Sequence, residues 1–226
     1  MTDSETSPPS PWVAVFDLDG TLTWRDTLGP FLGTFLRAHP HRVFGLWRLP
    51  FALFDYLARD RDRGKLKSRV IRIVMGGATR PAIDACADAF VGSFTARRRW
   101  RPTALAVLEA HRAAGDRLVL LSASPDLYVP RIGALLGFEL TVCTEIQWQG
   151  DRLDGGLKTP NRRGDEKSHC LAKLRTQYPG LPMVAYGNSA SDVDHMRQAE
   201  RALLVNGNAA ARTLAARWAI PTGTWD

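Results

Sequence analysis

The chain has 226 residues, of which 45% are hydrophobic, enough for a sizeable core in one domain with an insertion or in two small domains. Its net charge of +7 comes mostly from arginine and suits phosphate-bearing ligands or anionic lipid surfaces, whereas no zinc-finger spacing or recognition-helix pattern supports nucleic-acid binding, so we expect no nucleic-acid partner. No apolar run reaches the ~18 residues that a membrane-spanning helix needs.

Residues 1–11 are polar and rich in proline, and we interpret them as a disordered tail that lacks the apolar stretch of a secretory signal. The cysteines Cys86, Cys143 and Cys170 lie far apart and match no disulfide or zinc spacing. They predict buried thiols in a reducing compartment, and hence a cytoplasmic protein.

Four short apolar runs, at residues 12–16, 118–121, 182–186 and 201–205, are typical of buried parallel strands. Between and after them, helical patterns cover residues 102–114, 127–136, 168–178 and 191–199. This alternation predicts an α/β fold, with a Rossmann-like doubly wound parallel sheet. Residues 140–157 alternate in polarity and contain a turn sequence at 149–151, which predicts a β-hairpin beside the main sheet.

The long stretch 24–99 contains no clear strand pattern. Its apolar residues recur at helical spacing, first at Leu28, Phe31 and Phe35 and later at Ile83 and Phe90. We therefore predict a helical cap over residues 24–99, above the carboxyl ends of the strands. The α/β core would then consist of residues 12–23 and 100–226.

The first predicted strand ends in two aspartates, Asp17 and Asp19. Because side chains alternate along a strand, both carboxylates can face the same side. Gly20 permits a sharp turn, and Thr21 can offer its hydroxyl or amide to a phosphate oxygen. Adjacent carboxylates repel each other, and oxygen ligands without nitrogen or sulfur suit Mg²⁺. With a metal to balance charge, one carboxylate can attack phosphorus while the other moves a proton.

The segment Val15–Leu22, VFDLDGTL, resembles the first motif of the haloacid dehalogenase-like phosphatases, and the cap resembles that of their phosphoserine-phosphatase-like branch. The other family motifs follow in order. Ser122, with the adjacent amide of Ala123, resembles the second motif, which holds the phosphoryl group. Lys167 resembles the third, which offsets the charge of the phosphoryl oxygens. Residues 187–192, GNSASD, resemble the fourth, which completes the metal site.

This resemblance implies that Asp17 is a nucleophile that forms an aspartyl phosphate, and that Asp19 acts first as an acid and then as a base for water. The Asp19 carbonyl would also bind Mg²⁺. The second aspartate favours a phosphoester substrate over dehalogenation. The fourth motif usually begins Gly-Asp, but Asn188 stands at the second position here. Our hypothesis is that Asn188 binds the metal and Asp192 supplies the acidic charge.

Two positions bear on the substrate, which the resemblance suggests is a small phosphorylated metabolite such as phosphoserine or histidinol phosphate. Asp26 stands where phosphoserine phosphatases place a glutamate that receives the substrate's amino group. Arg69 falls near their arginine for the substrate carboxylate. Asp26 is one methylene shorter than that glutamate, and Gly20 stands where those enzymes typically have Ser.

The segment 43–57 is rich in Trp and Phe and is flanked by Arg. Three readings remain open for it: packing inside the cap, a homodimer contact, or peripheral contact with the inner face of a membrane. With the last reading, the chain resembles bacterial phosphatidylglycerophosphate phosphatases, and the substrate would carry a phospholipid head group. Two further alternatives are a phosphotransferase and a catalytically weak phosphate- or lipid-binding module.

Overall fold

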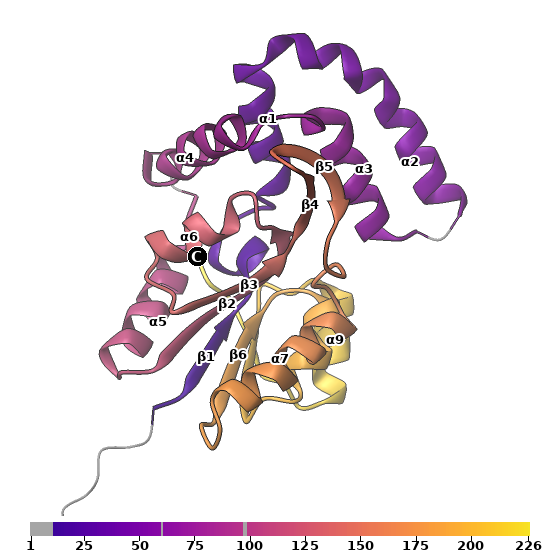
Figure 1. Cartoon of the computed structure of the whole chain (residues 1–226). Coiled ribbons are helices and arrows are strands. Elements are labelled where there is room, and N and C mark those ends of the chain that lie inside the picture. Colours follow the sequence, from indigo (N-terminus) through magenta and orange to yellow (C-terminus); the bar gives the residue numbers. More distant parts are fainter. Residues whose placement is uncertain (1–10, 60, 97–98) are drawn as a thin grey trace, which may run out of the picture.

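The computed structural model describes residues 11–59, 61–96 and 99–226 (Figure 1). Except for Pro11, the predicted tail lies outside the described residues. None of the helices in these ranges combines the length and the apolar character needed to cross a membrane.

A six-stranded parallel sheet with the order β3-β2-β1-β6-β7-β8 forms the centre of the fold. Its strands are β1 (Val13–Phe16), β2 (Arg117–Pro125), β3 (Leu140–Thr144), β6 (Met183–Gly187), β7 (Arg201–Val205) and β8 (Thr222–Gly223). All four residues of β1 are buried, as expected for a central strand covered on both faces. The four predicted strands and the α/β fold class are therefore confirmed.

Both faces of this sheet are covered by helices (Figure 1). Val13 and Val15 pack on the side of α7, whereas Ala14 and Phe16 pack on the side of α5 and α6. The covering elements are α5 (Pro102–Ala113), α6 (Val129–Leu135), α7 (Asp165–Gln177), the 3-10 turn η3 (Ala190–Asp192), α8 (Val193–Met196) and α9 (Ala209–Arg217). The helix predicted over 191–199 is thus divided in two and ends three residues earlier.

The prediction of a hairpin over 140–157 is partly wrong. Residues Leu140–Thr144 form β3, an edge strand of the main sheet that pairs with β2. Only β4 (Ile146–Gln149) and β5 (Arg152–Leu157) form the hairpin, which turns at Gly150 with φ +59°. Leu140, Val142, Ile146 and Trp148 keep the same period of two on both sides of Thr144, so the pattern did not reveal that the chain leaves one sheet for another.

Residues 24–99, called the cap from here on, are helical as predicted in the part that the structure describes. The elements are α1 (Leu28–Ala38), the 3-10 helix η2 (Pro40–Arg48), α2 (Leu49–Ala58), α3 (Arg63–Met75) and α4 (Arg80–Ala96). They lie beyond the carboxyl ends of the strands, and the β4–β5 hairpin rises from the sheet beside α3 (Figure 1). Phe31, Phe35, Ile71 and Phe90 form the centre of the cap's packing.

Candidate active site

Asp17 follows β1, the strand at which the strand order of the sheet reverses. The chain runs from β1 to β2 on one side and later returns to β6 on the other, so a crevice opens at the carboxyl end of β1. A cavity of about 760 Å³ occupies this crevice between the sheet and the cap. Its lining includes Asp17, Asp19, Lys167, Asn188 and Asp192.

Asp17 is one member of a buried charged triplet with Lys167 and Asp192. The Lys167 ammonium lies 2.6 Å from Asp17 Oδ1 and 2.7 Å from Asp192 Oδ1, and the three residues are at most 7% exposed. Burial raises the pKa of Asp17 to about 7, although Lys167 opposes this shift. Burial alone would lower the pKa of Lys167, but Asp17 and Asp192 together raise it above its usual value. Lys167 therefore stays charged beside the expected nucleophile.

Asp19 is held in place by three hydrogen bonds. The amide and the hydroxyl of Thr27 both donate to Oδ1 at 2.7 Å, and the Ser124 hydroxyl donates to Oδ2 at 2.6 Å. Because the Thr27 hydroxyl proton points to Asp19, the Tyr128 hydroxyl, 2.7 Å from Thr27 Oγ1, is the donor in that pair. Burial and the charge of Asp26 raise the pKa of Asp19, which suits a carboxyl that has to deliver a proton.

Thr27, Ser124 and Tyr128 were not identified from the sequence. Ser124 is two residues beyond Ser122 on the same strand, but the period of two does not identify it, because the adjacent residues Ala123 and Ser124 line the cavity and Ser122 does not. Nothing in the sequence connects Thr27 or Tyr128 with Asp19, since the three come together only when cap and sheet pack. Tyr128 packs its ring against Phe31 and Phe90 of the cap, at centroid distances of 4.5 and 5.2 Å.

The turn after Asp17, η1 (Leu18–Leu22), has no room for a side chain at Gly20. Gly20 has φ +84°, and an added Cβ would lie 2.0 Å from Nδ2 of Asn188. The glycine and the Asn188 side chain thus occupy complementary space. Thr21 is fully buried, and its hydroxyl donates to Asp17 Oδ2 at 3.1 Å, so it orients the carboxylate and does not line the cavity.

Asp192 closes the loop that follows β6. Its Oδ2 accepts hydrogen bonds from the Ser189 amide at 2.9 Å, the Ser189 hydroxyl at 2.6 Å and the Asn188 amide at 3.3 Å. Burial would raise the pKa of Asp192, but Lys167 and His195 lower it below its usual range. This carboxylate is therefore ionised and fixes the position of Asn188.

The donor set at the cavity floor fits a hard divalent cation. Asp17 and Asp192 share the single positive charge of Lys167, at 2.6 and 2.7 Å, and Asp19 adds a third carboxylate to the same floor. The donors are carboxylate, amide and carbonyl oxygens, the ligand type that Mg²⁺ prefers. Among the described residues, no cluster of three His, Cys, Asp or Glu side chains forms a metal cage by itself. A cation here would therefore also use oxygens such as those of Asn188 and the Asp19 backbone.

Ser122 and Ala123 lie at the end of β2. Ser122 is fully buried, and its hydroxyl accepts a hydrogen bond from the Ser124 amide at 3.1 Å. Ala123 lines the cavity, and its carbonyl accepts from Thr144 Oγ1 at 2.7 Å and from the Lys67 ammonium. Ser122 thus supports the loop from below, whereas Ala123 and Ser124 face the cavity.

Of the two residues expected to select the substrate, only Asp26 lines the cavity. Its Oδ1 also accepts a hydrogen bond from the Leu28 amide at 2.9 Å. Arg69 pairs with Asp55 and lies outside the lining of this cavity, so the structure does not bring it together with the other expected site residues. Residues two apart on a helix point in nearly opposite directions, and Lys67 holds the inward position on α3.

Lys67 lies beside the expected phosphoryl site. Its ammonium donates to Asn161 Oδ1 at 2.6 Å and to the carbonyl of Ala123. Burial lowers the pKa of Lys67 to about 8, against the opposing charges of Asp19 and Asp26. The sequence offered one signal for it: Arg63, Leu66, Lys67 and Val70 share one helical face, and all four line the cavity.

The cap also contributes an apolar wall to the cavity. Trp24, Leu28, Tyr56, Leu66 and Val70 line this side, opposite the charged floor. Basic side chains stand between the two, namely Arg25, Arg63, Lys67 and Arg163. The cavity therefore fits an anionic group at its floor and a partly apolar group toward the cap.

Comparisons with known proteins agree with this geometry. Residues 14–197 match the model of the haloacid dehalogenase-like hydrolases. Protein CicA of Caulobacter vibrioides is 38% identical over 193 residues, which cover 84% of each chain. A Bordetella pertussis protein of unknown function has a TM-score of 0.76 at 18% identity, over 94% of this chain and 98% of that one.

The fold is also that of a phosphoserine phosphatase. The phospho-aspartyl intermediate analogue of such an enzyme has a TM-score of 0.63 at 13% identity, over 91% of each chain. The match to the family model covers most of the sequence, and the fold agrees with the phosphoserine-phosphatase-like branch. The chain belongs to the haloacid dehalogenase-like hydrolases.

Proposed function

We propose that this protein is a Mg²⁺-dependent phosphomonoester hydrolase that works through an aspartyl phosphate on Asp17. The observation that carries the proposal is the arrangement of two aspartates around one cavity floor. Asp17 is paired with Lys167 at 2.6 Å, and Asp19 is held by Thr27 and Ser124. One carboxylate is thus kept beside a positive charge, and the other is kept where a proton donor is needed.

In the first half-reaction, an Asp17 oxygen attacks phosphorus and the bond to the ester oxygen breaks. Asp19, whose pKa is raised by burial, gives its proton to the departing alkoxide and becomes ionised. Lys167 offsets negative charge on the phosphoryl oxygens and on Asp17. Phosphoryl transfer depends mainly on such positioning and charge neutralisation.

In the second half-reaction, the ionised Asp19 takes a proton from water as the water oxygen attacks the phosphorus of the aspartyl phosphate. The bond between phosphorus and Asp17 breaks, inorganic phosphate leaves, and Asp19 is protonated again for the next cycle. The Thr27 and Ser124 hydrogen bonds keep Asp19 in one orientation for both steps.

Asp17, Asn188, Asp192 and the Asp19 carbonyl would hold Mg²⁺, which would neutralise charge on the phosphoryl oxygens. Asn188 brings an amide oxygen and no negative charge, so the acidic contribution on its loop comes from Asp192, two of whose hydrogen bonds are to the Ser189 amide and hydroxyl. A water molecule could connect Asp192 with the cation.

We infer a small phosphorylated metabolite, of the kind of phosphoserine or histidinol phosphate, as the substrate class. Asp26 at the cavity lining would receive an amino group, and Lys67 rather than Arg69 would receive a second anionic group. The apolar wall of Trp24 and Tyr56 favours a second candidate, a phosphomonoester with a lipid head group.

The test is phosphate release from a panel of phosphomonoesters, with and without Mg²⁺. The panel contains phosphoserine, histidinol phosphate, phosphatidylglycerophosphate and an aryl phosphate. We expect Mg²⁺-dependent release that falls by more than about a thousandfold in Asp17→Asn. Transfer of the phosphoryl group to an added alcohol, in place of release of inorganic phosphate, would indicate a phosphotransferase. A folded protein that releases no phosphate from any ester would indicate a binding module.

A further inference from the structure

One face of the cap carries most of the exposed large hydrophobic side chains of the described residues. Seven of the ten such side chains fall within residues 43–57, and only three lie elsewhere. The seven are Val43, Phe44, Trp47, Phe51, Leu53, Phe54 and Leu57, with exposed fractions from 49% to 84%. We call these seven residues the apolar face of the cap.

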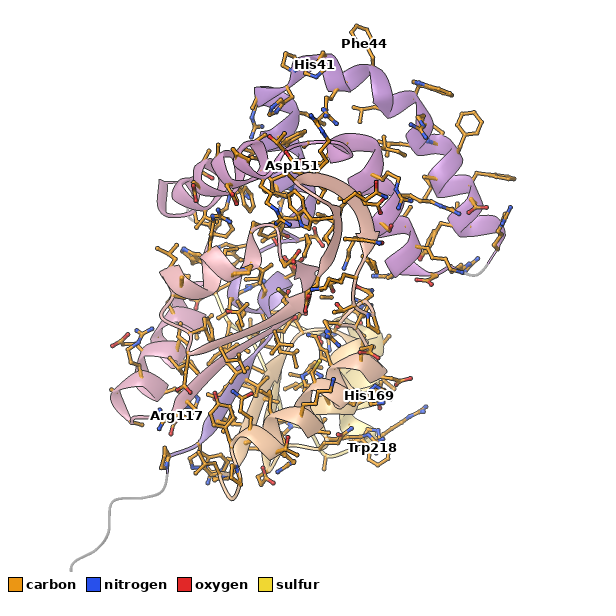
Figure 2. All side chains as sticks on the ribbon, in the orientation of Figure 1. His41, Phe44, Arg117, Asp151, His169 and Trp218 are labelled. Carbon is orange, nitrogen blue, oxygen red and sulfur yellow. The ribbon has the colours of Figure 1, made fainter. Side chains whose placement is uncertain are left out.

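The apolar face is a continuous stripe on consecutive helices. Phe44, Trp47, Phe51 and Phe54 follow one another at steps of three or four residues, so they share one side of η2 and α2. Trp47 and Phe51 make an edge-to-face ring contact, with centroids 5.9 Å apart. Figure 2 shows Phe44 pointing away from the protein at the outer edge of the cap.

The helices that carry this face are firmly attached to the rest of the cap. Arg42 donates to the carbonyl of Gly76 at 2.7 Å, which ties η2 to the end of α3. Ala52, on the opposite side of α2, is buried. Ala52 is the one buried residue of α2, so the helix contacts the rest of the cap along a narrow side and leaves its apolar side chains exposed.

The charges around the apolar face are mostly basic. Within residues 40–59 the basic residues are Arg42, Arg48 and Arg59, and Asp55 is the sole acidic residue. Asp55 is already paired with Arg59 at 2.6 Å and with Arg69. Two copies of the chain meeting through this face would bring like charges together, whereas an anionic lipid surface would neutralise them.

We propose that the apolar face of the cap docks on anionic membrane surfaces. The aromatic rings would enter the interface between head groups and acyl chains, and Arg48 and Arg59 would lie at the level of the phosphates. Tyr56, between Phe54 and Leu57 on the same helix, lines the catalytic cavity. Docking through α2 therefore holds the catalytic cavity close to the membrane surface.

The test is flotation of the full chain with vesicles of phosphatidylcholine alone or mixed with phosphatidylglycerol. We expect binding to the mixed vesicles, weaker binding at high salt, and a loss of affinity of about tenfold in Trp47→Ser. Trp218→Ser is the matched control, since Trp218 is 50% exposed and Trp47 67%. Trp218 lies at the opposite end of the molecule from Phe44 (Figure 2), and its variant should bind like the wild type.

The double variant Phe51→Ser/Phe54→Ser should lose vesicle binding and keep full activity on a soluble aryl phosphate, which shows that it is folded. Asp17→Asn should float like the wild type, so a failure of docking is distinguishable from a failure of the proposed catalysis. Absence of binding by the wild type, or equal binding by Trp47→Ser and Trp218→Ser, would overturn the proposal. A wild-type dimer that floats with neither vesicle and dissociates in the double variant would also overturn it, in favour of a second copy.

Discussion

The floor of the cavity and the outer face of the cap differ in which side chains they bury and which they expose. At the floor, charged groups are buried, and hydrogen bonds hold Asp17, Asp19, Lys167 and Asp192. On the cap, apolar rings such as Phe44 and Phe54 are 84% and 72% exposed. Each arrangement is unfavourable by itself, because buried charges and exposed apolar patches both cost stability or solubility. The floor thus gathers the residues expected to carry out the chemistry, and the cap exposes the face that we propose docks on membranes.

The largest effect is expected from Asp19→Asn, which keeps the shape of the floor and removes the transferable proton. For an alkyl phosphate, whose leaving group needs protonation, turnover should fall by about a hundredfold to ten thousandfold. An aryl phosphate with an acidic leaving group should lose much less in the first half-reaction. Single-turnover kinetics with both esters measure the contrast, and equal losses would show that Asp19 is not the acid.

The next effect concerns the stability of the floor. Lys167→Met leaves the buried carboxylates of Asp17 and Asp192 without their shared cation, and should lower the free energy of unfolding by about 3–5 kcal/mol. Urea denaturation in the presence of a chelator measures it. Adding Asp17→Asn to this variant should recover part of the loss, and a double variant no more stable than the single one would contradict this pairing.

The Lys167→Met variant should become less stable as pH rises. Asp17 already has a pKa raised to about 7 by burial, and without Lys167 its pKa should rise further. A carboxyl with a raised pKa binds more protons in the folded state than in the unfolded state, so stability is lost as pH rises through the folded pKa. The wild type, with Lys167 in place, should show a shallower decline over the same range.

A smaller effect is expected at the boundary between floor and cap. Lys67 has a pKa lowered to about 8 by burial, with Asp19, Asp26 and Arg163 among the charges that face it. Below this pH it is charged and can bind an anionic substrate group, so kcat/KM should fall by about tenfold per pH unit above pH ~8. In Lys67→Arg the charge persists and this decline should disappear. A decline that is identical in both proteins would assign it to another group.

The smallest effect is expected on the outer face. Phe51→Ser/Phe54→Ser removes side chains that are 65% and 72% exposed, so the free energy of unfolding should change by less than about 0.5 kcal/mol. Thermal or urea unfolding checks this. Phe31→Ala is the internal comparison. Phe31 is fully buried in the cap, so this substitution should lower the free energy of unfolding by about 3–5 kcal/mol. Similar losses in the two proteins would show that the apolar face is packed.

The sequence predicted the sheet and the floor better than it predicted the cap side of the site. Strands such as Val13–Phe16 are short, apolar and followed at once by polar residues, so both the strand and Asp17 at its end could be read locally. Lys67, Thr27 and Tyr128 act through contacts between segments far apart in the chain. Lys67 and Asn161, for example, are 94 residues apart in the sequence, yet Lys67 Nζ lies 2.6 Å from Asn161 Oδ1.

Arg69 illustrates why the rest could not be predicted. A shift of one or two residues along a helix changes which side chain faces the cavity. A family resemblance does not place a cap helix to that precision. The helical face of Arg63, Leu66, Lys67 and Val70 is regular in the sequence, but only the packing of α3 over the sheet shows that it faces the cavity. The aromatic side chains of 43–57 could likewise have been buried or exposed until their neighbours were placed.

The most direct measurement is to trap the covalent intermediate. Asp19→Asn should slow the attack of water, so protein mixed with Mg²⁺ and an aryl phosphate and then quenched in acid should retain one phosphoryl group. Mass spectrometry of the digested protein should place that group on the peptide containing Asp17, and hydroxylamine should remove it. A phosphoryl group on another residue, or Mg²⁺-dependent turnover that survives in Asp17→Asn, would contradict the assignment of Asp17 as the nucleophile.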